Sequence, residues 1–324
     1  MNVVSLFDGM SCGQLALRYM GQKDYSYYAS EVDKHSIKIT QKNFPDTIQI
    51  GDVRKVSYRD GILFTENGEY KIGPVTYLFA GSPCQNLSIT VINNKKHNKG
   101  LEGEKSKLFY EFLRLLKEIN PKYYLYENVG TMKNVDRDII SEMLGVPHTH
   151  IDSEDFTAQG RSRYYWTDIK VDPVEFEEDK VLDGIEFKAK HKWVLEDILL
   201  GAEDIPDKYW YDDTLVEDVD MNQKVCAKLN IKGHDILKRV YNPKHKGPTL
   251  TAVTGGNHQK KVFQNGRARK MVPIEYERLQ GVRDNYTEGV SDTQRWCMLG
   301  NGWTIPVIMH ILKNSLPSVP SSKV

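Results

Sequence analysis

Cys84 is the strongest candidate for a nucleophile in this sequence. It stands in the segment GSPCQNLS (81–88), directly after an apolar run. A cysteine at the carboxyl end of a buried strand, in a turn shaped by glycine and proline, can be held by free backbone N–H groups as a reactive thiolate. An inert buried cysteine is the commoner case, so Cys84 needs partners before it indicates catalysis.

Glu127 and two arginines are the candidate partners. Glu127, in YENVG, ends another apolar run, and adjacent parallel strands would bring its carboxyl near Cys84. A thiol beside a carboxyl that can hold a proton suits attack on a ring carbon with protonation of a ring nitrogen. Arg161 and Arg163, in QGRSR, lie two residues apart and would project from one face of a strand. They are either surface arginines or guanidinium donors to a carbonyl or phosphate.

A glycine-punctuated turn and two acids indicate a nucleotide-like cofactor. The turn is FDGMSCG (7–13), where glycines let a ligand approach the backbone and the amino end of the next helix. Glu31 lies 22 residues after Gly9, a spacing typical of a carboxylate that binds the two hydroxyls of a ribose. Asp52, in GDVRKV, could accept from an adenine amino group. Solvated carboxylates would give the same pattern, and the cofactor need not carry a phosphate.

The elements that must position these residues alternate along the chain. Buried strands are predicted at 3–7, 25–30, 75–81, 123–129 and 163–171, and helices at 14–19, 33–42, 107–119, 273–280 and 304–312. Continuous apolar strands separated by helices predict a mostly parallel α/β sheet covered on both faces, with ligands at the carboxyl ends of its strands. The charge-rich and loop-rich residues 173–267 predict a second, smaller domain.

Composition narrows the function classes. The chain has 324 residues and no net charge, but 172–220 carries 17 acidic residues against 5 Lys, and 224–270 carries 12 basic residues against one Asp. The basic block would suit a polyphosphate partner, unless the two blocks pack together and cancel. The four cysteines form no CxxC pair, a pattern that fits a protein of the reducing cytosol and argues against a structural zinc site. No apolar run is long enough for a membrane span.

Eight segments together resemble the motifs of the C5-cytosine DNA methyltransferase family. In order they are FDGMSCG, SEVDK, GDVRKV, GSPCQNLS, YENV, QGRSR, RKMVPIEYERLQG and GNGWTIPVI. They resemble most closely the catalytic half of the vertebrate de novo enzymes, although phage and bacterial members are similarly compact. The resemblance implies an S-adenosylmethionine-dependent methyltransferase (Rossmann-like) α/β fold with a mixed, mostly parallel sheet. Residues 1–172 and 268–324 would form its catalytic domain, and 173–267 a target recognition domain.

The same resemblance implies roles for individual residues. Cys84 matches the nucleophile that adds to cytosine C6, and Glu127 matches the acid that engages N3 and the exocyclic amine. Arg163, with Arg161 beside it, matches the residue that supports O2. The activated C5 takes the methyl group of S-adenosylmethionine, S-adenosylhomocysteine is released, and no metal is expected. The residues implied to bind the cofactor are Phe7, Asp8, Gly9, Glu31, Val32, Asp52, Val53, Ser82, Pro83, Asn301 and Trp303.

The implied partner is double-stranded DNA, whose target base must be flipped out of the helix. The residues expected to contact DNA are Gln85, Ser88, Lys95, Lys96, Lys99, Thr249, Lys260 and Lys261. The protein is expected to act as a monomer in the cytoplasm of a bacterial or phage-infected cell, or in the nucleus if it is eukaryotic. Three alternatives are cytosine-C5 methylation of RNA, a non-enzymatic binding module, and a nicotinamide-dependent oxidoreductase inferred from Glu31 alone.

Overall fold

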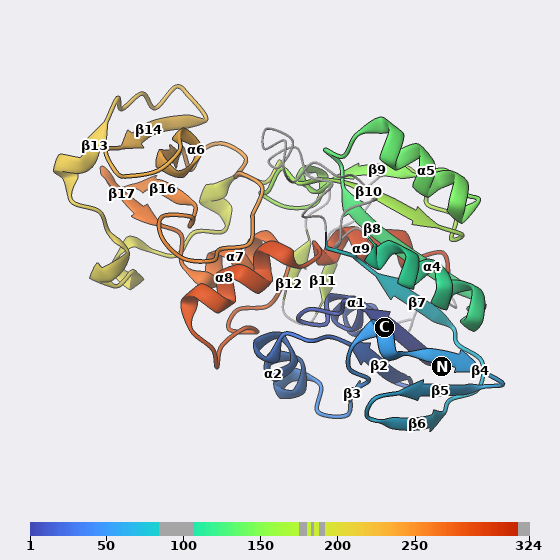
Figure 1. The fold of residues 1–324 in the computed structure, drawn as a ribbon. Helices are drawn as coiled ribbons and strands as arrows, with labels where there is room; N and C mark the ends of the chain where they lie inside the picture. The colour runs from blue at the N-terminus through green and yellow to red at the C-terminus, as the bar shows by residue number, and fades with distance from the viewer. Residues whose placement is uncertain (84–106, 175–179, 183–184, 188–191, 317–324) are drawn as a thin grey trace, which may run out of the picture.

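The apolar runs of the N-terminal half form one seven-stranded sheet (Figure 1). The computed structural model describes residues 1–83, 107–174, 180–182, 185–187 and 192–316. The sheet has the order β3-β2-β1-β7-β8-β10-β9, in which β3 to β8 are parallel and β10 is antiparallel to both neighbours. The predicted mixed, mostly parallel α/β sheet is confirmed. Its strands are β1 (Asn2–Leu6), β2 (Ser26–Ser30), β3 (Ile48–Gln49), β7 (Tyr77–Ala80), β8 (Tyr123–Val129), β9 (Thr149–Asp152) and β10 (Ser162–Thr167).

Helices cover both faces of this sheet, because successive strand residues point to opposite faces. Val3 and Phe79 belong to one apolar cluster, whereas their neighbours Val4 and Leu78 belong to another. The first cluster is completed by α1 and α9, and the second by α4 and α5. The helices are α1 (Cys12–Tyr19), α2 (Lys34–Asn43), α4 (Leu108–Ile119), α5 (Asn134–Leu144), α7 (Pro273–Leu279), α8 (Asp292–Asn301) and α9 (Ile305–Leu312).

A small antiparallel sheet follows β3, where no element was predicted. It consists of β4 (Ser57–Arg59), β5 (Ile62–Thr65) and β6 (Gly68–Lys71). Asp60 and Gly61, between β4 and β5, both have positive φ, as a two-residue hairpin turn of this handedness requires. The strands are short and mostly exposed, so their apolar pattern is too weak to predict them.

The smaller unit contains a separate five-stranded sheet, at the upper left of Figure 1. Its last strand extends three residues past the predicted boundary at 267, because β17 pairs with β16 along its whole length. A two-stranded ribbon, β11 (Lys180–Leu182) and β12 (Ile185–Phe187), precedes it. The five strands and the short helix α6 are β13 (Val216–Glu217), β14 (Val225–Leu229), α6 (Asp235–Lys238), β15 (Arg239–Tyr241), β16 (Lys261–Gln264) and β17 (Arg267–Lys270).

A buried ion pair joins the smaller sheet to α7. The side chains of Arg269 on β17 and Glu275 on α7 have no exposed surface. Arg269 donates to both carboxylate oxygens, from Nη1 to Oε2 at 2.8 Å and from Nη2 to Oε1 at 2.6 Å. A bidentate pair fixes direction as well as distance, so it holds β17 and α7 together in one orientation. Among the described residues, no helix is long and apolar enough to cross a membrane.

Candidate functional site

Glu127 and Arg163 form an ion pair near the carboxyl ends of β7 and β8. Tyr165 of β10 is paired with Glu127 of β8, and Arg163 is paired with Val129. Glu127 and Arg163 are therefore diagonal neighbours on one face of the sheet. Arg163 Nε lies 2.8 Å from Glu127 Oε1, and only 12% and 11% of the two side chains is exposed. A nearly buried carboxylate is thus held in place by one guanidinium.

The end of β7 leads directly to the predicted nucleophile. The Ser82 hydroxyl lies 2.6 Å from the hydroxyl of Tyr126, and Asn128 donates to the Ser82 carbonyl at 3.4 Å. These contacts fix the chain beside β8, two residues before Cys84. Cys84 itself lies outside the described residues, and so do Gln85, Ser88, Lys95, Lys96 and Lys99.

Arg161 does not share the surroundings of Arg163, although the two were expected to project together. Arg161 lies just before β10, and only 4% of it is exposed. Its guanidinium donates to the carbonyls of Leu250 at 2.9 Å, Gly300 at 3.2 Å and Gly302 at 2.9 Å. Arg161 therefore ties β10 to the segment that leaves the smaller unit and to the turn between α8 and α9. This arrangement indicates a structural tether rather than a donor to substrate.

The turn between α8 and α9 reaches the Glu127 carboxylate. The indole Nε1 of Trp303 donates to Glu127 Oε2 at 3.1 Å, and the ring meets Phe79 edge to face, with centroids 6.4 Å apart. Asn301, the last residue of α8, is exposed. Sequence reasoning assigned Trp303 to the cofactor and gave no signal of its contact with Glu127.

The first loop, 7–11, has a strained backbone beside open space. Phe7, Gly9 and Ser11 have φ of 57°, 58° and 65°, a left-handed conformation that is uncommon for residues other than glycine and clusters at functional sites. A Cβ at Gly9 would meet no atom within 4 Å. Phe7 is half-buried, and Asp8 is buried. Burial raises the pKa of Asp8 to about 6, although Tyr27 donates to its Oδ1 at 2.9 Å.

Glu31 links this loop to the end of β2. Its Oε2 accepts from the Gly9 N–H at 2.7 Å, and its Oε1 accepts from the N–H groups of Val32 and Asp33 at 2.7 and 2.8 Å. Val32 is 73% exposed. The carboxylate and an exposed apolar side chain therefore lie together at the carboxyl end of the strand beside β1.

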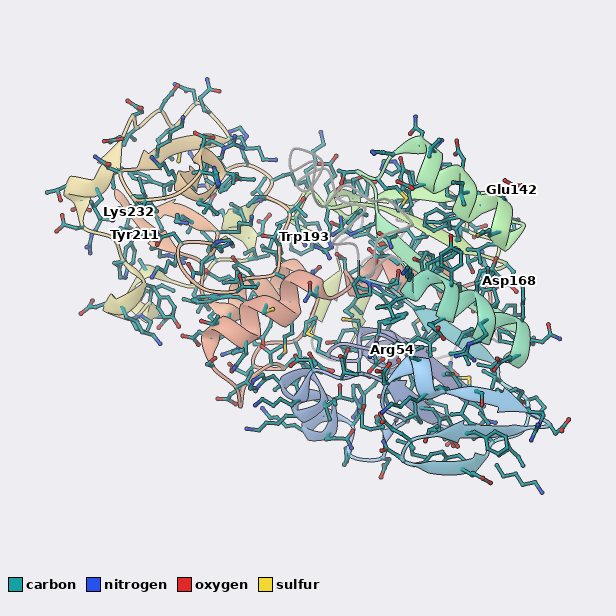
Figure 2. The ribbon with its side chains drawn as sticks, viewed as in Figure 1. Arg54, Glu142, Asp168, Trp193, Tyr211 and Lys232 are labelled. Atoms are coloured by element: carbon teal, nitrogen blue, oxygen red, sulfur yellow. The ribbon has the colours of Figure 1, made fainter. Side chains whose placement is uncertain are left out.

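Asp52 caps the short 3₁₀ turn Val53–Lys55 after β3. Its carboxylate accepts from the backbone and side chain of Arg54, which is labelled in Figure 2, and these hydrogen bonds lower the pKa of Asp52 below its ordinary value. Val53 is buried. Glu66, in the β5–β6 turn, accepts from the Asp52 N–H at 2.9 Å. The unpredicted hairpin therefore buttresses this acid.

Two of the three described residues expected to contact DNA are buried. Lys260 is 9% exposed and Lys261 is 1% exposed. Lys261 Nζ donates to the carbonyls of Asn257 and Gln259 at 2.7 and 2.8 Å. Burial lowers the pKa of Lys260 to about 8 and that of Lys261 to about 7. Neither ammonium group is exposed for a phosphate contact, so the expectation is corrected for both. Thr249 is half-buried, and its hydroxyl donates to the Gly160 carbonyl at 2.6 Å.

The acidic and basic blocks pack against each other, since β13 of the acidic block pairs with β14 of the basic block. Arg267 Nε of the basic block lies 3.4 Å from Asp213 Oδ1 of the acidic block. Within the basic block, Lys228 and Arg239 both pair with Asp235. The blocks therefore lie together in part, as one alternative expected, whereas basic residues such as Lys224 and Lys232 remain exposed.

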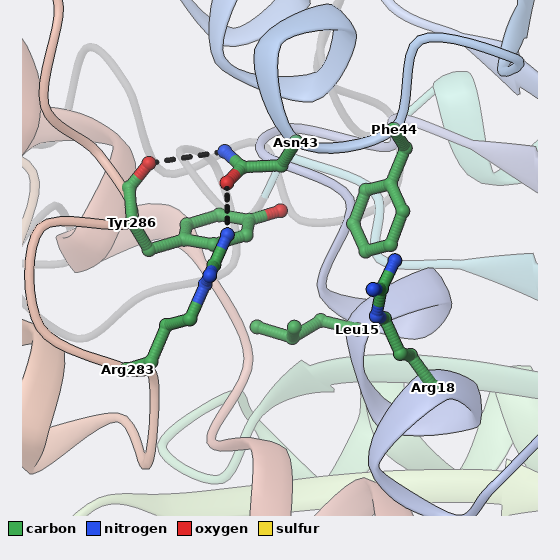
Figure 3. A pocket seen from close by; sticks show the side chains of 6 residues that line it. All are labelled: Leu15, Arg18, Asn43, Phe44, Arg283 and Tyr286. Atoms are coloured by element: carbon green, nitrogen blue, oxygen red, sulfur yellow. Dashed lines mark hydrogen bonds between the residues drawn. The ribbon is translucent and has the colours of Figure 1, made fainter. Parts of the chain in front are cut away.

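A small hollow between α1, α2 and the loop before α8 holds Asn43, which bonds the Tyr286 carbonyl and Arg283 (Figure 3). None of its lining residues is a predicted site residue; they are Leu15, Arg18, Asn43, Phe44, Arg283 and Tyr286. Within the described ranges, no three His, Cys, Asp or Glu side chains are grouped so that they could hold a metal ion.

Comparison with known sequences finds one family over nearly the whole chain. Residues 1–316 match the family described as C-5 cytosine-specific DNA methylase. The orphan methyltransferase M.SPBetaI of Bacillus phage SPbeta is 27% identical, with 97% of each chain covered. The type II methyltransferase M1.ScrFI of Lactococcus lactis subsp. cremoris is 27% identical over 99% of this chain and 79% of its own.

Solved structures share the fold. The methyltransferase EhMeth of Entamoeba histolytica has a TM-score of 0.68 at 17% identity, with 97% of each chain covered. A putative DNA modification methyltransferase encoded within an E. coli prophage has a TM-score of 0.62 at 18% identity, with 97% of this chain and 98% of its own covered. Both cover the smaller unit as well as the main sheet, so the likeness extends over the whole architecture.

Proposed function

Because the chain belongs to the C-5 cytosine-specific DNA methylase family, and is therefore a cytosine-C5 methyltransferase, we propose that it acts on a flipped-out cytosine in DNA through a covalent bond between Cys84 and C6. Ring carbon C5 is a poor nucleophile. Addition of the Cys84 thiolate to C6 breaks the C5=C6 double bond and makes C5 an enamine carbon, as N3 takes up a proton.

The pairing of Glu127 with Arg163 is the observation that carries this proposal. Glu127 can give a proton to N3 and accept from the exocyclic amine. A guanidinium has five N–H donors, and Arg163 uses Nε on Glu127 and Nη1 on the Ser162 carbonyl, so further donors remain for cytosine O2. After C5 gains the methyl group, loss of the C5 proton and cleavage of the S–C6 bond restore the aromatic ring and the thiolate, and N3 returns its proton to Glu127.

The residues at the ends of β1, β2 and β3 fit S-adenosylmethionine, which supplies the methyl group. Glu31 is an acceptor for ribose hydroxyls, and Asp52 for the adenine amine. The half-buried ring of Phe7 and the exposed Val32 offer apolar surface for the adenine, and the open space beside Gly9 leaves room for the ligand to approach the backbone. Asp8, Val53, Ser82, Pro83, Asn301 and Trp303 remain in this proposed set.

Double-stranded DNA is the proposed substrate. Gln85, Ser88, Lys95, Lys96, Lys99 and Thr249 stay among the proposed contacts, whereas the buried Lys260 and Lys261 leave them. Exposed lysines of the smaller unit, such as Lys224, Lys232 and Lys244 (Lys232 is labelled in Figure 2), can supply phosphate contacts in their place.

Methyl transfer from radiolabelled S-adenosylmethionine tests the proposal. The wild-type chain should label C5 of cytosine in mixed-sequence DNA, Cys84→Ala should abolish labelling, and Cys297→Ala, a control in α8, should leave it intact. An oligonucleotide carrying 5-fluorocytosine should become covalently attached through residue 84. Equal labelling by wild type and Cys84→Ala, or no attachment in the presence of the methyl donor, would refute the covalent mechanism.

The same assay separates DNA from RNA as the substrate. Unlabelled DNA and transfer RNA are added as competitors at equal nucleotide concentration. The proposal expects DNA to compete more strongly, and stronger competition by RNA would assign the activity to RNA.

A further inference from the structure

Both oxygens of the Glu127 carboxylate have a side-chain donor. Arg163 Nε holds Oε1 at 2.8 Å, and the indole N–H of Trp303 holds Oε2 at 3.1 Å. We propose that Trp303 is a positioning residue, whose N–H sets the orientation of Glu127 toward the target base. The inference rests on the proposed function, because it requires Glu127 to be the acid that meets cytosine.

Gly81 leaves the space in which this contact forms. A Cβ at Gly81 would lie 2.8 Å from Trp303 Nε1 and 3.2 Å from Glu127 Oε2. Gly81 is not among the glycines with positive φ, so its backbone conformation is open to other residues. Glycine is therefore favoured at position 81 by the lack of room for a side chain, because the Trp303 indole and the Glu127 carboxylate occupy that room.

The chain around Trp303 is held on several sides, so the indole is not free to drift. The Gly302 carbonyl accepts from Arg161 at 2.9 Å and from Gln280 at 3.2 Å. The Thr304 hydroxyl donates to Gln280 Oε1 at 2.7 Å. A Cβ at Gly302 would come within 3.0 Å of Met10, so the turn lies against the first loop. The Trp303 N–H can restrain the Glu127 carboxylate only if the Trp303 backbone is itself held in place, and these contacts hold it.

The second donor matters because of the geometry of a carboxylate. The terminal torsion of glutamate is broad, so a single donor on Oε1 leaves Oε2 less restrained. Each carboxylate oxygen has about two lone pairs, so Oε2 can accept from Trp303 and still accept from the base. Restraint before the base arrives lowers the ordering cost of the reactive geometry. Loss of the N–H should therefore lower kcat more than it weakens cofactor or DNA binding.

Replacing Trp303 with 3-benzothienylalanine tests this role, because that residue keeps the ring shape and carries sulfur where the indole has N–H. A hydrogen bond to a charged group corresponds to roughly a tenfold to hundredfold change. We expect kcat to fall by about that factor, with the DNA KM and the Kd for S-adenosylhomocysteine changed less than about threefold. The matched control is the same replacement at Trp296, whose buried indole donates to the Met271 carbonyl at 3.2 Å; it should leave kcat within about twofold.

The outcomes separate the two levels of inference. If the wild-type chain methylates no cytosine, the proposed function fails. If it does, and the replaced chain keeps a kcat within about twofold, only the role of Trp303 is overturned. A rise in the S-adenosylhomocysteine Kd that matches the fall in kcat would also overturn it, because the indole N–H, rather than the ring alone, would then act on the cofactor instead of on Glu127.

A second variant approaches the contact from the other side. Gly81→Ala should displace the indole and lower kcat. Combined with Trp303→Phe, which removes the N–H, it should cause little further loss, because both changes break one interaction. Full additivity of the two losses would contradict a shared contact.

Discussion

Replacing Arg161 with methionine should destabilise the native state by about 3–5 kcal/mol, while Cys84, Glu127 and the residues proposed to bind the cofactor remain unchanged. Arg161 is 4% exposed, and its guanidinium donates to three backbone carbonyls. Hydrogen bonds from a charged donor contribute about 1.5–3 kcal/mol each. The loss is smaller than their sum, because methionine also removes the cost of burying a charge.

Urea unfolding at pH 7 measures this loss as a lower midpoint at unchanged slope. Arg161→Lys keeps the charge but supplies its N–H groups from a single atom, which cannot span three carbonyls as a planar guanidinium does. It should therefore lose an intermediate amount. Arg59→Met is the control, because the Arg59 side chain is 78% exposed beside Asp60; its change should stay within about 0.5 kcal/mol.

Turnover separates a tether from a donor to substrate. A tether predicts that Arg161→Met keeps kcat within about tenfold of wild type at a temperature where the variant is fully folded. A loss of stability below about 1 kcal/mol, together with a fall in kcat of more than about a hundredfold, would refute the assignment. Arg161 would then act on the base, as the family resemblance implied.

Three further perturbations test buried charges elsewhere in the chain. The pKa of Asp8 is near 6 in the native state against 3.8 in the unfolded chain, so the stabilisation from this bound proton is present below pH 3.8 and lost as the pH rises through 6. Relative to wild type, the free energy of unfolding of Asp8→Asn in urea should therefore rise by up to about 3 kcal/mol between pH 4 and pH 8. The pKa of Lys261 is near 7 in the native state against 10.5 in the unfolded chain, so its contribution to stability is present above pH 10.5 and lost as the pH falls through 7. Relative to wild type, the free energy of unfolding of Lys261→Met should therefore rise by up to about 5 kcal/mol as the pH falls through this range. A difference in urea midpoints that stays constant with pH would contradict the burial of the Lys261 amine. Arg269→Met should cost about 3–5 kcal/mol in urea unfolding by leaving the Glu275 carboxylate buried and unpaired, and adding Glu275→Leu should recover most of that loss.

The main sheet could be predicted from sequence because its strands are buried on both faces. The run 75–81 is almost uninterrupted apolar sequence and 123–129 begins with four apolar or aromatic residues, and the structure has strands at Tyr77–Ala80 and Tyr123–Val129. The hairpin strands β4 to β6 were missed because half-exposed strands of three or four residues carry little pattern. Helix α8 was missed for a related reason: Arg295 is buried within it, so polar residues interrupt its apolar face.

In the candidate site, too, local sequence predicts some features, and others depend on contacts between distant segments. Glu127 follows from its place at the end of a strand, which is local information. Its contact with Trp303 joins residues 176 positions apart and depends on how the turn after α8 docks, which no local pattern contains. The burial of Lys260 and Lys261 was also invisible, because a lysine-rich segment predicts a positive surface until the tertiary fold shows which side chains it encloses.

The turn at Gly302 is the junction that explains why separate segments form one site. Its carbonyl accepts from Arg161, which also binds the Leu250 carbonyl on the segment leaving the smaller unit. The next residue, Trp303, binds the Glu127 carboxylate. The segment that leaves the smaller unit and the Glu127 carboxylate are therefore joined through two side chains and one peptide group, without a continuous strand between them. Changes to Arg161 act on the junction itself and should alter stability first, whereas loss of the Trp303 N–H acts beyond the junction and should alter turnover alone. A chain in which both changes had the same effect on both quantities would not be organised in this way.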